Sequence, residues 1–286
     1  MSDELRGKVC VITGGNRGIG RAAAEGLARM GGEVVLACRD AKKGEAARDE
    51  IRSATGNDAV HVMPVDLASQ KSIRAFADAL RERFPALHVL VNNAGVIESK
   101  RTLTEDGIET TFAVNHLAYF LLTNLLLKHL EAGAPARIIN VSSAAHKRLG
   151  DFEDPQSEKS YDPLDAYSKS KLANILFTSQ LAQRLGGTGI TVNCLHPGTV
   201  GTGLLDQFFG SRLLLKPAKL FLKPWIIGPE QGAKTILYLA TSPAVAEVSG
   251  KYFVNEQQAT SSKVSYDEIK GNQLWEQSLE LTARSK

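Results

Sequence analysis

Three residue types that could together transfer a proton lie in the middle of the chain. Ser143 ends the run RIINVSS, Tyr167 follows it by 24 residues, and Lys171 follows Tyr167 by four residues in YSKSK. When a hydride moves between a nicotinamide and a carbonyl carbon, negative charge develops on the carbonyl oxygen. Such a reaction needs a hydroxyl acid, a second donor and a nearby cation. The three residues therefore predict a Ser-Tyr-Lys proton-transfer site.

The Tyr-Lys pair carries little weight by itself. Residues four apart lie on one helix face, and many surface helices contain such a pair by chance. The prediction therefore depends on what else the chain contains.

A glycine-rich turn, TGGNRGIG, directly follows the first predicted strand. Its Gly14, Gly18 and Gly20 have the spacing G-x-x-x-G-x-G, and a helical pattern begins near Ile19. Backbone amides of such a turn can hold a pyrophosphate, since no Cβ blocks its approach. The spacing differs from the G-x-G-x-x-G fingerprint, and a plain tight connection is the alternative. Its place between a strand and a helix favours phosphate binding.

The end of the second predicted strand indicates which dinucleotide binds. An NAD-preferring site places a carboxylate there for the ribose 2′-hydroxyl, whereas this chain has Cys38 and then Arg39. Arg39, together with Arg17 in the glycine turn, could hold a 2′-phosphate, because a guanidinium matches phosphate in charge and geometry. The sequence therefore predicts NADP(H), with solvated surface arginines as the alternative. Asp40 counts against this prediction.

Two further strand ends fit the adenosine half of such a cofactor. Asp66 follows the third strand, where its carboxylate could accept from the adenine amino group, and an ordinary helix N-cap is the alternative. The run NNAG, residues 92–95, ends the fourth strand, where small residues allow a close approach of backbone to the ribose. A plain turn would look similar.

The elements that must position these residues alternate along the chain. Apolar runs occur at 9–13, 33–38, 59–65, 87–92, 136–142, 190–195 and 251–255, and amphipathic helical patterns separate them. Strands that are apolar throughout indicate a parallel sheet covered on both faces. We expect one α/β domain over 1–286, a Rossmann-type doubly wound fold with about seven strands. Its cofactor half spans about 1–140 and its catalytic half about 141–286.

Composition excludes several classes of protein. The formal net charge is +3, and Lys and Arg are spread along the chain, so nucleic-acid binding is not expected. The six histidines and three cysteines have no metal-ligand spacing, which predicts no metal and buried reduced thiols. No signal peptide is visible, since MSDELRGKVC has acidic residues and no apolar run before the first strand, and no run of 18 apolar residues that could span a membrane occurs. We therefore expect a cytoplasmic protein.

Together these motifs resemble the short-chain dehydrogenase/reductase family. TGGNRGIG, Asp66, NNAG, VNHLAYFLLT, the Ser-Tyr-Lys set and HPGTVGT occur in the family's order over nearly the whole chain. The runs LACRD, AYSKSKLANILFTSQLAQRL and HPGTV are most similar to its retinol dehydrogenase branch. The long spacing from Ser143 to Tyr167 also fits that branch.

The resemblance implies a catalytic set of Asn115, Ser143, Tyr167 and Lys171. Tyr167 would exchange the proton with the substrate oxygen, and Lys171 would stabilise its tyrosinate, because the ordinary pKa of about 10 is too high for a base. Ser143 would hold the substrate oxygen, whereas Ser142 points to the other face of the strand. Asn115 would hold a water chain leading to Lys171, with a helix kink as the alternative.

The resemblance also implies most of the cofactor contacts. Pro197 and Gly198 would turn the chain beneath the nicotinamide, and Val200 and Thr202 would meet its carboxamide. The whole predicted cofactor set is Gly14, Asn16, Arg17, Gly18, Ile19, Gly20, Arg39, Asp66, Leu67, Asn93, Ala94, Gly95, Tyr167, Lys171, Pro197, Gly198, Val200 and Thr202.

The expected substrate is a small hydrophobic aldehyde, ketone or alcohol, with retinaldehyde-like compounds leading. A lid is expected at about 199–229, since 204–227 is rich in apolar residues. Subunit packing or peripheral contact with a membrane surface are the alternatives for this segment. The rival functions are reduction of steroid, quinone or secondary-metabolite ketones, and NADP(H) binding by a non-catalytic regulatory protein. Family members often pair through the helices carrying Asn115 and Tyr167, which implies a homo-oligomer.

Overall fold

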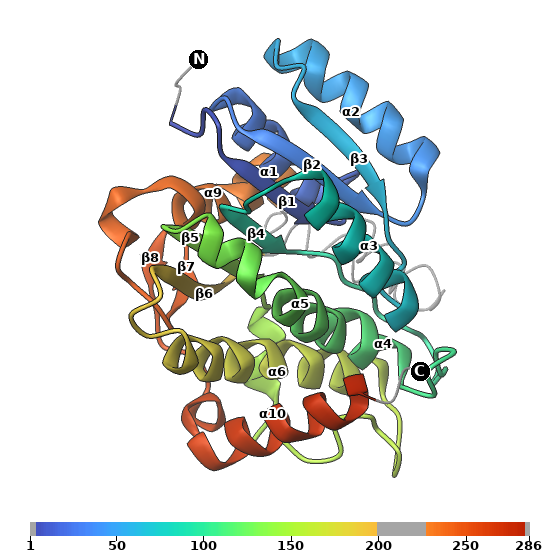
Figure 1. The fold of residues 1–286 in the computed structure, drawn as a ribbon. Helices are drawn as coiled ribbons and strands as arrows, with labels where there is room; N and C mark the ends of the chain where they lie inside the picture. Colours follow the sequence, from blue (N-terminus) through green and yellow to red (C-terminus); the bar gives the residue numbers. More distant parts are fainter. Residues whose placement is uncertain (1–3, 199–226, 284–286) are drawn as a thin grey trace.

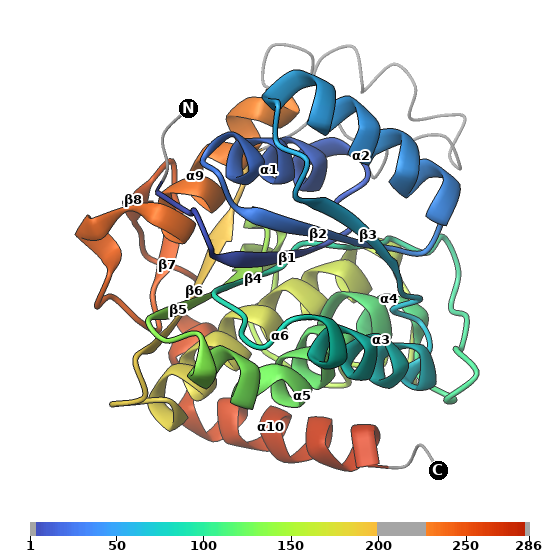
Figure 2. The same ribbon diagram turned by 45° about the horizontal axis from the view of Figure 1, so that its top comes forward.

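The computed structural model describes residues 4–198 and 227–283. Within them one sheet has the strand order β3-β2-β1-β4-β5-β6-β7-β8, and helices cover both of its faces (Figures 1 and 2). The strands are β1 (Val9–Thr13), β2 (Glu33–Cys38), β3 (Val60–Pro64), β4 (Val89–Asn92), β5 (Ala136–Val141), β6 (Ile190–His196), β7 (Tyr252–Val254) and β8 (Gln257–Gln258).

The doubly wound prediction is confirmed, with one difference at the edge of the sheet. The seven predicted strands are β1 to β7, and they pair in parallel. The eighth strand, Gln257–Gln258, pairs antiparallel with β7 after a tight turn. Two exposed glutamines carry no apolar pattern, which is why the sequence gives no sign of this strand.

Two helical layers enclose the sheet. Helices α1, α2 and α9 lie on one face and α3, α5 and α6 on the other, with α10 packed outside α6 (Figure 2). Their bounds are α1 (Gly18–Arg29), α2 (Ala41–Thr55), α3 (Gln70–Arg83), α4 (Thr110–Phe112), α5 (Ala118–Ala132), α6 (Pro163–Arg184), α9 (Pro229–Thr241) and α10 (Glu268–Ala283). Short helices are η1 (Ala113–Leu117), η2 (Ala144–Arg148), η5 (Pro243–Val245) and η6 (Lys263–Tyr266).

Strand β1 shows why the sheet residues are apolar throughout. Val9 and Val11 pack into the core beneath α3 and α5, whereas Cys10 and Ile12 pack into the core beneath α1 and α9. Successive side chains of a strand point to opposite faces, so a strand covered on both sides has no solvent-facing position.

The strand order positions the site. Strands β1 and β4 are neighbours, and from this pair the sheet continues in opposite directions. A crevice forms at the carboxyl ends of the strands where the order reverses. The glycine turn, Arg39, Asp66, Asn93 and Ser143 each follow a strand, and all of them therefore reach the same edge of the sheet.

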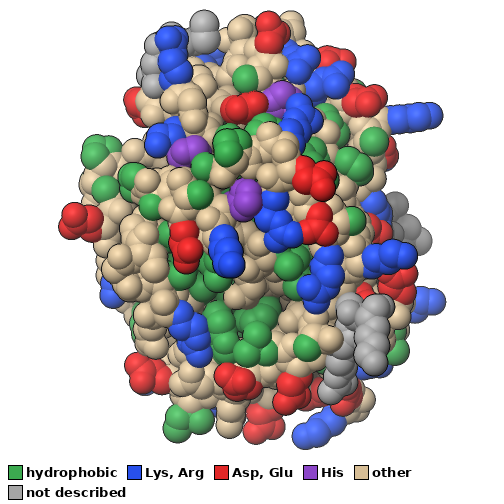
Figure 3. Space-filling view, in the orientation of Figure 1, with side chains coloured by type: hydrophobic (Ala, Val, Ile, Leu, Met, Phe, Trp, Pro, Cys, Tyr) green, Lys and Arg blue, Asp and Glu red, His purple; other side chains and the backbone are tan. Residues whose placement is uncertain are grey.

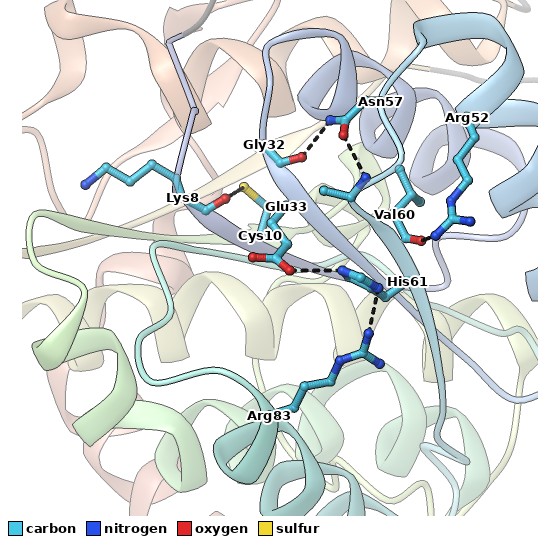
Figure 4. A network of polar contacts seen from close by, with 10 residues as sticks. Lys8, Cys10, Gly32, Glu33, Arg52, Asn57, Val60, His61 and Arg83 are labelled. Carbon is cyan, nitrogen blue, oxygen red and sulfur yellow. Dashed lines mark hydrogen bonds and ion pairs between the residues drawn. The ribbon is translucent and has the colours of Figure 1, made fainter.

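A second polar network lies at the start of strand β2, at the opposite edge of the sheet from the cavity (Figure 4). Arg83 donates to Nδ1 of His61 at 2.7 Å, so the Nε2 proton of His61 is donated to Glu33 at 3.0 Å. Asn57 bridges the turn by donating to Gly32 and accepting from Ala59. This network joins β2, β3 and α3, and none of its residues lines the cavity described below.

Among the residues that the structure describes, one helical stretch would be long and apolar enough to cross a membrane. It runs over Thr110–Ala132 with a mean hydropathy of 1.3, but 78% of its most apolar window is buried within the protein. Figures 1 and 2 show its main helix, α5, between α3 and α6. In this structure it is a core helix.

Charged side chains of both signs lie on the surface, and the cysteines lie in the interior. In Figure 3 the Lys and Arg side chains are interspersed with Asp and Glu over the visible face. Cys10, Cys38 and Cys194 are free and buried. In the described part of the chain, no cluster of three or more His, Cys, Asp or Glu is placed to hold a metal ion.

Candidate active site

A cavity of about 820 Å³ opens at the carboxyl ends of the strands. The glycine turn and Arg39 line one end, and Ser143, Tyr167 and Lys171 line the other. The structure thus brings together residues that lie more than a hundred positions apart in the sequence. Every described residue of the predicted cofactor set lines this one cavity.

The glycine turn has the backbone shape that a bound phosphate requires. Gly14 has φ +67°, a conformation that L side chains rarely adopt. A Cβ on Gly20 would lie 2.4 Å from the Gly14 carbonyl oxygen and 2.5 Å from Nδ2 of Asn93. Helix α1 begins at Gly18, so its unpaired N–H groups face the cavity end of the turn. Glycine at both positions therefore lets the turn and the start of α1 pack this closely, and the N–H groups there could hold a dinucleotide pyrophosphate.

Thr13 links this turn to the next strand end, and the sequence analysis did not select it. Its hydroxyl accepts from the backbone N–H groups of Asn93 and Ala94 at 2.8 and 3.1 Å. Asn93 in turn donates through Nδ2 to the Thr13 carbonyl at 2.8 Å. The one sequence signal for a role of Thr13 was that it begins the run TGGNRGIG. Many strands end in a threonine, so that signal is weak.

Two arginines mark the end of the cavity where a 2′-phosphate would lie. Arg17 and Arg39 are exposed, line the cavity, and have no ion-pair partner among the residues of 4–198 and 227–283. Asp40, which counted against NADP(H), instead caps α2 by accepting from the Lys43 backbone at 3.1 Å. Its carboxylate also pairs with the Lys43 ammonium at 3.1 Å. Backbone and side-chain hydrogen bonds from Lys43 lower the pKa of Asp40.

Asp66 lies in the cavity wall and does not cap α3. The N-cap of α3 is Ser69, whose hydroxyl accepts from Ser72 N. One carboxylate oxygen of Asp66 accepts from Ala68 N at 3.0 Å, which fixes the turn that carries Leu67. The alternative that Asp66 is the N-cap of the helix is therefore wrong, because Ser69 is the N-cap.

The two serines at the end of β5 have separate environments. Ser142 is buried and donates to the Lys171 carbonyl at 2.8 Å, which ties the strand to α6. Ser143 is half-buried in the cavity wall, and its hydroxyl also caps η2 by accepting from Ala145 N at 3.2 Å. Ser143 is thus the serine whose hydroxyl faces the reacting end.

Helix α6 presents Tyr167 and Lys171 to the cavity from its second and third turns. Asp162 caps the helix by accepting from Leu164 N and Asp165 N at 2.9 and 3.0 Å, and Pro163 fills the first helical position. Residues 167 and 171 follow on one face. Both side chains line the cavity.

Burial moves the pKa of both groups away from their ordinary values. It raises the pKa of Tyr167 to about 12, and a hydrogen bond with Ser143 opposes the rise. It lowers the pKa of Lys171 from 10.5 to about 7. The Lys171 ammonium donates to the Val141 carbonyl at 3.0 Å and lies 5.6 Å from the ring centres of Tyr119 and Tyr167. A cation so close to the tyrosine favours the tyrosinate.

Asn115 is fully buried behind the cavity wall and does not line it. It lies in the π-helical turn η1, which is an irregularity of the helix of the kind expected as the alternative. Its amide group also makes hydrogen bonds of its own. Its Oδ1 accepts from Val96 N at 2.8 Å, and its Nδ2 donates to Val96 O and to Ser170 Oγ at 2.9 and 3.0 Å. The side chain therefore pins the chain after β4 against the helix that carries Tyr167 and Lys171.

The predicted nicotinamide end is described only in part. Pro197 and Gly198 line the cavity after β6, and Gly198 has φ +88°. His196, which was not predicted as a site residue, lines it too, and its Nδ1 accepts from Gly198 N at 3.1 Å. Val200, Thr202 and the proposed lid through residue 226 lie outside the described residues.

The space beyond Ser143 and Tyr167 has an apolar lining. Ile97, Val114, Ala145 and Leu164 contribute to it, with Glu98 and Thr110 as polar neighbours. A carbonyl oxygen placed between the two hydroxyls would meet a donor, an acid and, behind them, a cation. This arrangement can exchange one proton with an oxygen that gains or loses negative charge, and it leaves room for an apolar group.

Comparison with known proteins matches this arrangement. The sequence model for "short chain dehydrogenase" matches residues 8–211. Human retinol dehydrogenase 12 is 46% identical over 280 residues, which are 97% of this chain and 87% of that protein.

Solved structures agree with these sequence matches. An uncharacterized protein of Mycobacterium paratuberculosis superposes with a TM-score of 0.77 at 33% identity, over 97% of this chain and 94% of that one. L-sorbose reductase of Gluconobacter frateurii, solved with NADPH and L-sorbose, gives 0.73 at 26% identity over 88% and 96%.

Proposed function

This chain belongs to the short-chain dehydrogenase family, and on that premise we propose that it is an NADP(H)-dependent oxidoreductase of hydrophobic carbonyls and alcohols, retinaldehyde-like compounds foremost. One observation carries the proposal. A single cavity holds the glycine turn and two arginines at one end and Ser143, Tyr167 and Lys171 at the other. A cofactor extended along it would place its reactive ring beside the proton donor.

The preference for NADP(H) rests on charge at the adenosine end. Arg17 and Arg39 could each contact a 2′-phosphate, and Asp40 is held by Lys43 away from that task. Charge-assisted hydrogen bonds from a guanidinium to phosphate are among the strong ones in proteins. NADPH in the L-sorbose reductase structure supports the same choice.

The residues of this chain would supply the proton chemistry. When bound, the cofactor supplies or accepts the hydride. In reduction, Tyr167 gives its hydroxyl proton to the substrate oxygen. The raised pKa of Tyr167 keeps that proton on the hydroxyl at neutral pH. Ser143 holds that oxygen as a second donor, and Lys171 stabilises the tyrosinate that forms. In oxidation the same groups act in reverse.

The substrate class rests on the apolar lining and on the relatives. Ile97, Val114 and Leu164 give the cavity an apolar wall next to the two hydroxyls. Retinol dehydrogenase 12 is a relative named for an apolar alcohol. The rival substrates, steroid, quinone or other ketones, would occupy the same space. A regulatory protein that only binds NADP(H) would need no Ser-Tyr-Lys set, which disfavours that alternative.

Cofactor oxidation tests the proposal directly. The purified protein is mixed with NADPH and separately with NADH, and loss of absorbance is followed across carbonyls from short aldehydes to retinaldehyde and bulky ketones. We expect NADPH-dependent turnover that improves with apolar chain length. Tighter binding of NADH would contradict the cofactor assignment, and tight NADPH binding without turnover of any member would favour the regulatory alternative.

A further inference from the structure

Two buried histidines connect the catalytic region to the C-terminal segment, residues Ser261–Ala283. His116 and His146 are both fully buried, and neither lines the cavity. Each has one ring nitrogen bonded to the catalytic side and the other bonded to the C-terminal segment. The proton transfer described above makes no use of either ring.

His146 links the loop of Ser143 to the start of the C-terminal segment. Its Nε2 accepts from the backbone N–H of Ser262 at 3.2 Å, and a backbone N–H can only donate. The ring proton of the neutral histidine therefore lies on Nδ1, which donates to the Ser143 carbonyl at 2.5 Å. The ring is also packed edge-on against Tyr252, with 5.2 Å between centres.

His116 links α10 to the turn that contains Asn115. Its Nε2 lies 3.1 Å from Ser278 Oγ, and its Nδ1 lies 3.3 Å from Asn174 Oδ1. Asn174 uses its Nδ2 group to donate to the Asn115 carbonyl at 2.9 Å. Because an amide oxygen only accepts, Nδ1 must donate to it, and Nε2 then faces the Ser278 hydroxyl, whose one proton can go to Nε2 or to the Leu274 carbonyl 2.7 Å away.

The result is a chain of polar contacts between α10 and the turn of Asn115. It starts at Ser278 on α10, passes through His116 and Asn174, and ends on the carbonyl of Asn115. Such chains polarise one another in a dry interior, so each bond depends on the next. Burial lowers the pKa of His116 to about 4, so the ring stays neutral at neutral pH and Nδ1 remains its one donor.

We infer that the C-terminal segment is part of the active-site scaffold, and that His146 positions Ser143 while His116 and Asn174 position the turn of Asn115. These are positioning residues, since each acts through another group. The inference deepens the proposed function and rests on it for the consequence in turnover. The structural part of the inference is that the C-terminal segment holds the turns of Asn115 and Ser143 in place. That part does not depend on which substrate is used.

His116→Phe and His146→Phe test the inference, with His61→Phe as the matched control. Phenylalanine keeps an aromatic ring for the packing around each histidine and removes both ring nitrogens. His61 likewise has two hydrogen-bonded nitrogens and an aromatic neighbour, but it lies in the distant network of Figure 4. Each variant is measured for kcat and KM with NADPH and for backbone hydrogen exchange.

We expect kcat to fall about tenfold or more in His116→Phe and His146→Phe, the equivalent of one strong hydrogen bond. The KM for NADPH should stay within about twofold of the original protein, because the cofactor end is untouched. Hydrogen exchange should accelerate around residues 113–118 in the first variant and 143–148 in the second. His61→Phe should lose stability without either effect.

Loss of kcat in all three variants in proportion to lost stability would overturn the inference, as would unchanged kcat and unchanged local exchange in the two test variants. If His116→Phe does not fold, Ser278→Ala replaces it, with Thr282→Ala as control. Both hydroxyls bond back to their own helix at 2.7 Å, but only Ser278 reaches His116. Should the original protein turn over no carbonyl, the proposed function fails, and local exchange alone still decides this inference.

Discussion

Tyr167 is the acid of the proposed reaction, and its hydroxyl is the one group in the site whose proton moves. Removing that hydroxyl in Tyr167→Phe should lower turnover by at least about a hundredfold, the usual contribution of a positioned general acid. The aromatic ring remains, so NADPH affinity should change little. Steady-state kinetics and a fluorescence titration with NADPH separate the two effects. Near-normal turnover would end the mechanistic claim.

Arg39 should decide between the two dinucleotides. In Arg39→Ala the KM for NADPH should rise about ten- to hundredfold, since a charge-assisted hydrogen bond contributes about 1.5–3 kcal/mol, whereas the KM for NADH should hardly move. Arg29→Ala is the control, because Arg29 lies on α1 and pairs with Glu25. A parallel rise for both cofactors would place Arg39 outside the phosphate site.

Lys171 should make stability depend on pH. Its pKa is 10.5 when unfolded and about 7 when folded. Between these values the unfolded chain binds more protons, so the free energy of unfolding should rise with pH across this range. Lys171→Met removes the buried charge and should stabilise the protein by about 1–3 kcal/mol at pH 7.

That gain should shrink towards pH 10, because the cost of deprotonating Lys171 on folding falls as the pH approaches the unfolded pKa of 10.5. Urea unfolding at both pH values measures it. Lys128→Met, at an exposed position of α5, should show no such pH dependence. An advantage for Lys171→Met that is the same at both pH values would refute the depressed pKa.

At the scale of elements, the start of α6 determines where Tyr167 lies. Asp162→Ala removes the cap from two backbone N–H groups and should cost about 1 kcal/mol of stability. Since Tyr167 is in the second turn, fraying there should also lower kcat several-fold. Ser69→Ala removes the cap of α3 at similar cost and should leave kcat unchanged at saturating NADPH. If kcat were the same in both variants, the cap of α6 would have no influence on the reaction, and the prediction would be wrong.

Elements with a clear period were predictable, and elements defined by tertiary contacts were not. The apolar runs located β1 to β7 to within a residue or two, because buried parallel strands have no polar positions. The strand β8 and the π-helical turn around Asn115 have no such pattern. The turn arises where Asn115 bonds to Val96 and Ser170, and such contacts between distant segments leave no local signal.

The site divides in the same way. Motif spacing located Ser143, Tyr167 and Lys171, and the cavity contains all three. Thr13, His196 and the two positioning histidines were missed or set aside, since a lone Thr or His in an apolar run most often indicates ordinary packing. The sequence also gives no sign of a link between the C-terminal helix and the site, because its bonds to His116 cross more than 160 positions of sequence.

For the whole molecule, α10 changes the expected assembly. It packs along α6, and Trp275 lies 5.0 Å from Phe120 of α5 and 6.0 Å from Phe177 of α6 between ring centres. Figure 2 shows it as an extra layer outside these helices. The family resemblance implied pairing through the helices of Asn115 and Tyr167, and in this structure α10 packs along one of them, α6.

We therefore expect a monomer, or an assembly through another face. Sedimentation velocity across a wide range of protein concentration measures this, and cross-linking with mass spectrometry locates any contact. Cross-links between subunits that join α5 or α6 of one copy to α5 or α6 of another would contradict the expectation. They would mean that α10 leaves its place on assembly.

The position of α10 also bears on how the protein fails when it is heated. A terminal helix can detach at a lower free-energy cost than central strands, because it has neighbours on one side only. Here that helix bonds to the wall of the reaction centre through Ser278 and His116. Warming should therefore abolish turnover while the sheet is still intact, so that thermal inactivation precedes melting and is reversed on cooling.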